Sequence, residues 1–178
     1  MAADRPRCSA FLAMSLDGYI ARKDGSIDWL ARVEHAGEDY GFQRFFDTVD
    51  TLAIGRNTWE VACGFDPWPY QGKRCVVLTH RPLDGHHGEE RFAGPVRQLV
   101  ESLATWGTRH VYVDGGQTVR QFLAAGLIDA LTLSIIPIVL GEGIPLFGGE
   151  LPEKGLVLDE TRSWPNGLVQ VRYRVAAS

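Results

Sequence analysis

The chain has 178 residues and a formal net charge of −4. This length suits one domain over residues 1–178, which can bury about 70% of its unfolded surface without disulfides or metals. Lys and Arg are scattered, so no basic stripe suits nucleic acid, and no apolar run is long enough to span a membrane. The three cysteines lie far apart without a C-x-x-C pair, as expected for reduced thiols in a cytoplasmic protein.

The first predicted strand, residues 8–14, is a short apolar run that ends in a turn. Residues 15–27 follow as a polar loop with two Asp-Gly turn signals. This loop is either a mobile segment over a site or a plain surface connection. From Asp28 onwards the spacing is helical, and an aromatic stripe is most simply interpreted as core; it contains Tyr40, Phe42, Phe45 and Phe46.

Three further predicted strands, residues 51–54, 73–78 and 110–113, each end in residues that suit an anion. Two of them lead into helices, whose first turns carry unpaired N–H groups, and glycine lets a ligand approach the backbone. Each turn alone also fits an ordinary structural role, with Asn57 or Thr58 capping the second helix. If the strands are parallel, however, their carboxyl ends form one ligand site. The residues concerned are Gly55, Arg56, Asn57 and Thr58; Thr79, His80 and Arg81; and Gly115 and Gly116.

The second half of the chain is predicted to complete a mixed sheet. Residues 82–95 form a loop, and its adjacent His86 and His87 are not expected to share a metal. A helix over 96–106 follows. Residues 131–140 form a buried strand, bent or bulged at Pro137, and 141–149 an exposed loop. An antiparallel hairpin over 156–164 and 168–176 ends the chain. The fold class is therefore α/β, with a mixed, mostly parallel central sheet flanked by helices.

Six stretches resemble the dihydrofolate reductase-like superfamily. Their order and spacing are similar to the group that shares the C-terminal reductase domain of the bifunctional riboflavin-biosynthesis deaminase-reductase. The stretches are SLDGYIA (15–21), GSIDWL (25–30), IGRNTWE (54–60), VVLTHRP (76–82), VDGGQTVRQFL (113–123) and PIVLGEGIPLF (137–147). The resemblance implies NADPH-dependent hydride transfer to a C=N or C=O of a pterin, pyrimidine or similar heterocycle.

The resemblance also implies roles for individual residues. The cofactor phosphates would contact the turn formed by Gly55, Arg56, Asn57 and Thr58. The adenosine ribose and its 2′-phosphate would contact Leu78, Thr79, His80 and Arg81. The pyrophosphate and the nicotinamide side would contact Gly115, Gly116, Gln117, Thr118 and Val119. The nicotinamide would be held by Ala13 and Ile20, and the substrate by Ser15, Asp17, Trp29, Pro137 and Leu140. The Gly115–Gly116 peptide is expected to be cis, and the 15–27 loop to be a lid.

The proton donor implied by the resemblance is Asp39, although extra residues separate it from Trp29; Glu38, Asp17 or water are alternatives. Two features depart from the riboflavin reductases: Tyr19 stands where they usually carry a basic residue suited to a phosphorylated sugar, and no deaminase zinc ligands are present.

Two other functions compete with the reductase: an NADP(H)-binding module without turnover, and a structural or interaction protein. The latter requires Arg56 and Arg81 to be ordinary surface residues. A homodimer is expected, because the central strand, the 137–147 loop and the hairpin offer an apolar surface.

Overall fold

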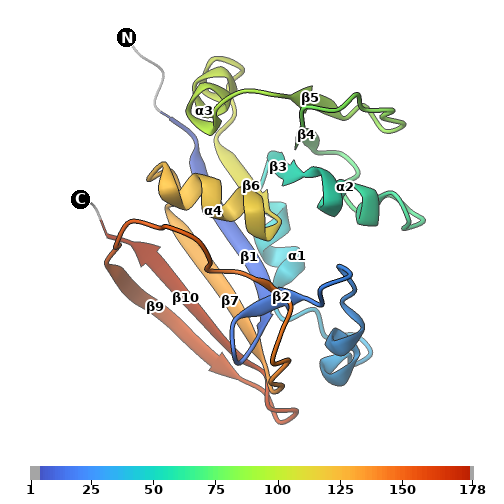
Figure 1. Cartoon of the computed structure of the whole chain (residues 1–178), viewed down its shortest axis with the longest axis vertical. Helices are drawn as coiled ribbons and strands as arrows, with labels where there is room; N and C mark the ends of the chain where they lie inside the picture. The colour runs from blue at the N-terminus through green and yellow to red at the C-terminus, as the bar shows by residue number, and fades with distance from the viewer. Residues whose placement is uncertain (1–4, 177–178) are drawn as a thin grey trace.

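The computed structural model describes residues 5–176 and has one eight-stranded sheet in the order β5-β4-β3-β6-β1-β7-β10-β9 (Figure 1). The first six strands of this order pair in parallel, whereas β10 pairs antiparallel with both β7 and β9. The bounds are β1 Arg7–Ser15, β3 Thr51–Gly55, β4 Arg74–Leu78, β5 Glu90–Phe92, β6 His110–Asp114, β7 Ala130–Ile136, β9 Leu156–Ser163 and β10 Val169–Val175. The predicted mostly parallel sheet and its C-terminal hairpin are confirmed.

Helices cover both faces of the sheet, because strand residues alternate between them. On one face, α3 (Val96–Thr105) and α4 (Gly116–Ala124) bury Leu99, Leu103 and Phe122 completely. Figure 1 shows α4 in front of β1 and α1 behind it. On that second face, α1 (Phe42–Asp47) and α2 (Arg56–Ala62) pack through Phe46 and Trp59 against Tyr112 of β6. Helices therefore cover much of the central sheet on both faces.

Two predicted elements are shorter than expected. The helix expected from Asp28 is a 3-10 helix, η1 (Asp28–Val33), separated from α1 by a segment in which Gly37, Tyr40 and Gly41 have positive φ. Such dihedrals end a helix. The strand expected over 131–140 stops at Ile136, since Pro137 has no N–H to donate to a ladder.

Three predicted loops contain strands. Tyr19–Ala21 (β2) pairs antiparallel with Ile144–Pro145 (β8), so neither 15–27 nor 141–149 is wholly irregular. Leu146, just after β8, is fully buried and holds this small sheet to the core. The 82–95 stretch contributes the short edge strand β5.

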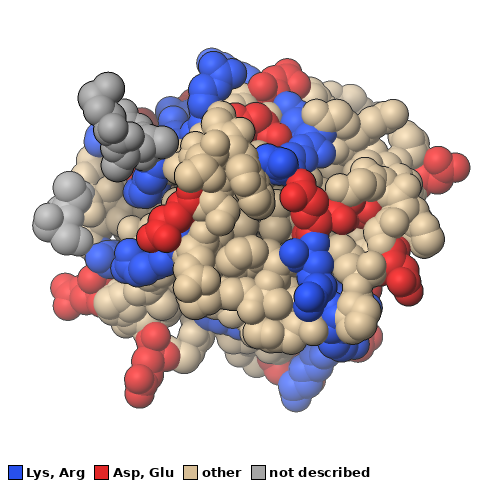
Figure 2. Space-filling model, turned by 90° about the horizontal axis from the view of Figure 1, so that it is seen from above, with Lys and Arg blue, Asp and Glu red and all other residues tan. Residues whose placement is uncertain are grey.

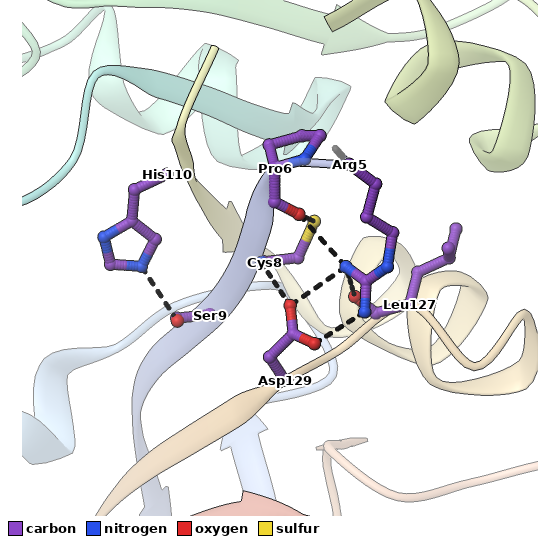
Figure 3. Close-up of polar contacts among 7 residues, drawn as sticks. All are labelled: Arg5, Pro6, Cys8, Ser9, His110, Leu127 and Asp129. Atoms are coloured by element: carbon purple, nitrogen blue, oxygen red, sulfur yellow. Dashed lines mark hydrogen bonds and ion pairs between the residues drawn. The ribbon is translucent and has the colours of Figure 1, made fainter. Parts of the chain in front are cut away.

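The amino-terminal edge of the sheet is held by a polar cluster around Asp129 (Figure 3). Its carboxylate accepts the N–H of Cys8 at 2.7 Å and pairs with the Arg5 guanidinium at 2.5 Å. His110 Nε2 lies 2.9 Å from Ser9 Oγ. Burial raises the pKa of the Cys8 thiol to about 12. These contacts fasten β1 to its neighbours at the edge opposite the predicted ligand site.

The surface carries charges of both signs. Figure 2 shows Lys and Arg interspersed with Asp and Glu on the face seen from above. Across residues 5–176, every helix is too short or too polar to cross a membrane.

Candidate functional site

The predicted turns meet at one edge of the sheet, because β4, β3 and β6 are adjacent and parallel. A Cβ added to Gly115 would lie 2.5 Å from Thr58 Oγ1, and one added to Gly55 would lie 3.0 Å from Thr118 Oγ1. Gly115 also has a φ of 91°, which side chains rarely adopt. The β3–α2 and β6–α4 turns are therefore packed against each other at a distance that only glycine permits.

Backbone amides face this edge without side-chain caps. The N-cap residues of α2 and α4 are Gly55 and Gly115, and neither helix has a side-chain cap hydrogen bond. The prediction that Asn57 or Thr58 caps α2 is wrong, because the helix already begins at Arg56. The first-turn N–H groups are thus left for water or a ligand, and an anion is the ligand they favour.

The expected cis peptide at Gly115–Gly116 is not found. Within residues 5–176 the cis bond is Asp66–Pro67. The positive φ of Gly115 turns the chain sharply enough with a trans peptide.

Arginines flank the same edge. Arg56 Nε lies 2.7 Å from Glu60 Oε1, and Arg56 Nη1 donates to the Pro82 carbonyl at 2.8 Å. Arg81 Nη2 is 3.8 Å from the same Glu60 oxygen, and 66% of its side chain is exposed. The Arg81 N–H donates to Thr79 Oγ1. Two cations therefore share one carboxylate, so each retains capacity for a phosphate.

The other predicted cofactor residues have different surroundings. Ile20 covers the α4 turn, since a Cβ on Gly116 would lie 2.5 Å from Ile20 Cδ1. Gln117 and His80 are exposed at the edge. Val119 is fully buried and Leu78 packs against the same core, so these two support the turns from behind.

A cavity of about 670 Å³ lies on the α1 face of the sheet. Its walls include Phe11 and Ala13 of β1, Ser134 and Ile136 of β7, and Phe42 of α1. Ala13, predicted to hold the nicotinamide, thus belongs to the cavity. The buried Ser134 hydroxyl accepts a hydrogen bond from Gln170 at 3.0 Å. The apolar part of this wall suits an aromatic ligand.

Asp39, the predicted proton donor, lines the cavity and is held by backbone hydrogen bonds. Its carboxylate accepts the N–H of Gln43 at 2.8 Å and of Gly41 at 2.9 Å. These backbone hydrogen bonds, that of Gln43 foremost, lower the pKa of Asp39, which is exposed. An ionised carboxylate that holds the start of α1 is poorly placed to donate a proton.

None of the five predicted substrate residues lines the cavity: Ser15, Asp17, Trp29, Pro137 and Leu140. Ser15 Oγ donates to Asp17 Oδ1 at 2.6 Å, and Asp17 accepts the N–H groups of Leu140 and Gly141. These groups join the 15–18 and 137–141 segments, and their contact with a substrate stays a prediction. Pro137 is exposed and contacts the hairpin turn at Gly167.

Trp29 remains next to the cavity. It packs with the cavity residues Val33, Ile136 and Leu168, and its buried Nε1 has no partner within residues 5–176. A buried N–H without a partner is costly, so an acceptor on a ligand or a water would stabilise it.

Asp114, which the sequence interpretation missed, lies directly before the α4 turn and is not among the residues that line the cavity. It ends β6 directly before Gly115, whose N–H it accepts at 2.8 Å. It lies on the same strand face as Tyr112, whose ring is 6.0 Å from the cavity residue Phe42. Burial raises the pKa of Asp114 to about 6. The sequence does contain a signal for this residue: an acidic side chain that follows a buried strand and directly precedes a pair of glycines.

Comparison with known proteins identifies the family. The model of the RibD C-terminal domain matches residues 73–170. This chain belongs to that family. Its architecture is accordingly that of the RibD reductase domain, consistent with the dihydrofolate reductase-like resemblance. The protein YwjB of Bacillus subtilis (strain 168), which is uncharacterized, is 38% identical over 166 residues, covering 92% of this chain and 94% of YwjB.

Two further similar proteins extend the comparison. A crystal structure from Shewanella sp. PV-4, named provisionally as a riboflavin biosynthesis protein, has 33% identity and a TM-score of 0.89, covering 96% of this chain and 99% of that one. The riboflavin biosynthesis protein RibD of Corynebacterium ammoniagenes is 27% identical over 161 residues, covering 83% of this chain but 48% of RibD. This chain therefore corresponds to about half of that relative.

Proposed function

We propose that the protein is a cytoplasmic NADPH-dependent reductase that transfers a hydride to a C=N or C=O of a pterin- or aminopyrimidine-type heterocycle. One observation carries the proposal: a phosphate-suited edge with Gly55, Gly115 and two arginines lies beside an apolar cavity that reaches Ala13. Membership in a reductase-domain family supports the same conclusion.

The residues of the edge fit NADPH. The glycine turns leave room where a Cβ would collide with Thr58 or Ile20, and uncapped amides of α4 suit the pyrophosphate. Arg56 and Arg81 suit the 2′-phosphate, which NADH lacks. When bound, NADPH supplies a hydride, with its two electrons.

The acceptor would occupy the cavity. There the aromatic walls and Ser134 orient its ring while excluding water. Its C=N or C=O carbon receives the hydride and its heteroatom a proton, with NADP⁺ as the other product. We propose Asp114 as the group that holds this proton near the site, because it precedes the Gly115 turn on the same strand face as Tyr112, whose ring contacts the cavity residue Phe42. Its pKa of about 6 keeps a protonated fraction near neutral pH.

A test follows the consumption of NADPH with a panel of dihydrofolate, dihydropterins and aminopyrimidines. At least one acceptor should be reduced. In the variant Arg81→Ala, the KM for NADPH should rise about ten-fold to a hundred-fold, from losing about 1.5 to 3 kcal/mol, while that for NADH stays constant. Arg162→Ala, on exposed β9, is the matched control. If none of these acceptors is reduced, the proposed reductase activity is contradicted.

An NADP(H)-binding module without turnover is the second candidate. The capping role of Asp39 favours it, because that carboxylate does not supply the acid expected on the cavity wall. This candidate predicts NADPH binding without consumption, and kinetics on the acceptor panel separate the two.

A homodimer is proposed through the edge strand β9. On this strand Leu156, Val157 and Leu158 are 43%, 43% and 55% exposed. One edge of the strand has no pairing partner among residues 5–176. A second copy pairing there would cover both the apolar side chains and the free backbone groups.

A further inference from the structure

The cavity is lined by aromatic rings and carboxylates. The rings of Phe11, Tyr40 and Phe42 form one part of its wall. The carboxylates of Glu34, Glu38 and Asp39 lie along another part. Within residues 5–176, no Lys or Arg side chain lines this cavity. His35 also lines the cavity, with its Nδ1 3.2 Å from the Ala36 carbonyl oxygen. An anionic ligand would therefore meet three carboxylates there and no Lys or Arg side chain of residues 5–176.

Two of these carboxylates are held in place. Glu38 accepts the N–H of Tyr40 at 2.7 Å and the Trp164 indole N–H at 3.2 Å. Asp39 is fixed by the N–H groups of Gly41 and Gln43. Neither side chain can turn away from an anion without losing these hydrogen bonds.

The arginines of the site cannot compensate. Arg56 follows β3 and Arg81 follows β4, whereas the cavity is lined by residues of β1 and β7, on the far side of β6. Both are placed at the cofactor edge. Tyr19, in the position after S-x-D-G, belongs to β2 and pairs with Pro145 of β8, so it adds no charge to the cavity.

On these grounds, and resting on the proposed function, we propose that the acceptor is a planar nitrogen heterocycle, neutral or cationic, that carries no phosphate. This separates the chain from a relative with the same fold. The Thermotoga maritima protein named as a 5-amino-6-(5-phosphoribosylamino)uracil reductase has 14% identity and a TM-score of 0.72, over 97% of this chain and 57% of that one. The substrate in that name is phosphorylated.

Calorimetric titration with two aminopyrimidines tests the proposal: 5-amino-6-ribitylaminouracil and its 5′-phosphate. Each is titrated into the wild-type protein with and without saturating NADPH. The unphosphorylated compound should bind about ten-fold more tightly or better, which is about 1.4 kcal/mol. Like charges across a binding site cost energy of this order.

Charge reversal in the cavity provides the second arm. Glu34 is exposed at the cavity, so Glu34→Lys should raise the relative affinity for the phosphorylated compound about three-fold or more. The matched control is Glu101→Lys, an equal charge change at an exposed residue of α3 on the other face of the sheet. This control should leave the ratio of the two affinities unchanged.

Equal or tighter binding of the phosphorylated compound would overturn the proposal, as would failure of both compounds to bind. Failure of the proposed function is distinguishable, because it appears in a separate assay as no consumption of NADPH with any acceptor of the panel. In that case the ratio of the two affinities measured without NADPH still shows whether the cavity prefers the compound without a phosphate.

Discussion

Replacing Asp114 by Asn should stabilise the protein at neutral pH. Burial raises the pKa of Asp114 from its ordinary value of 3.8 to about 6. The fold therefore favours the neutral acid, and its stability falls as the pH rises from about 4 through 6. The difference between the two values corresponds to about 2 to 3 kcal/mol, allowing for the partly exposed side chain. Asn keeps an oxygen that can accept the Gly115 N–H.

Urea unfolding of the wild type and of Asp114→Asn at about pH 4 and about pH 8 measures the contribution of Asp114 ionisation to the free energy of unfolding. The variant should be more stable by about 2 to 3 kcal/mol at the higher pH and by less than about 1 kcal/mol at the lower. A change in packing caused by the substitution alters the stability equally at both pH values, so it cancels when the two stability differences are compared. A stability difference that does not grow with pH would refute the reasoning.

Asp17→Asn is the control of opposite sign. The Ser15 hydroxyl, followed by the N–H groups of Leu140 and Gly141, lowers the pKa of Asp17. Its stabilisation is therefore present at neutral pH and lost as the pH falls through that lowered value. This variant should be less stable than the wild type at about pH 8, with a smaller difference under acid conditions.

Three other substitutions address the turns, the sheet and the dimer. Gly115→Ala should cost about 1 to 3 kcal/mol in urea unfolding and weaken NADPH binding, because of its positive φ and the contact with Thr58; unchanged stability would contradict this. Asp129→Ala should cost about 1 to 3 kcal/mol by leaving the Cys8 N–H unpaired, with NADPH affinity unaffected at the opposite edge. Leu158→Glu should sediment as a monomer where the wild type is a dimer; a monomeric wild type at micromolar concentration would remove the proposed interface.

The central sheet was predictable because buried parallel strands are short apolar runs between glycine and polar turns. Residues 51–54 and 110–113 follow this pattern and became β3 and β6. The pairing of β2 with β8 was not predictable, since it joins segments far apart in the sequence and each is too short to show alternation. Leu146 is buried by that tertiary contact, not by a local pattern.

Some parts of the candidate site could likewise be predicted from the sequence, and others could not. The glycine and arginine turns follow from strand ends and parallel order, so they could be predicted before any contact was known. Ser15 and Asp17 belong to a recognisable motif, but their partners at 140–141 are set by tertiary packing. Asp114 resembles an ordinary turn residue, and its raised pKa depends on burial in the folded protein.

Titration of the purified protein with NADPH and then with NADH tests the central claim most directly. Quenching of the five tryptophans reports binding, because Trp59 stacks at 5.5 Å from Arg56 and Trp29 adjoins the cavity. The account predicts that NADPH binds about ten-fold more tightly than NADH or better. Equal affinity for the two, or binding of neither, would contradict it.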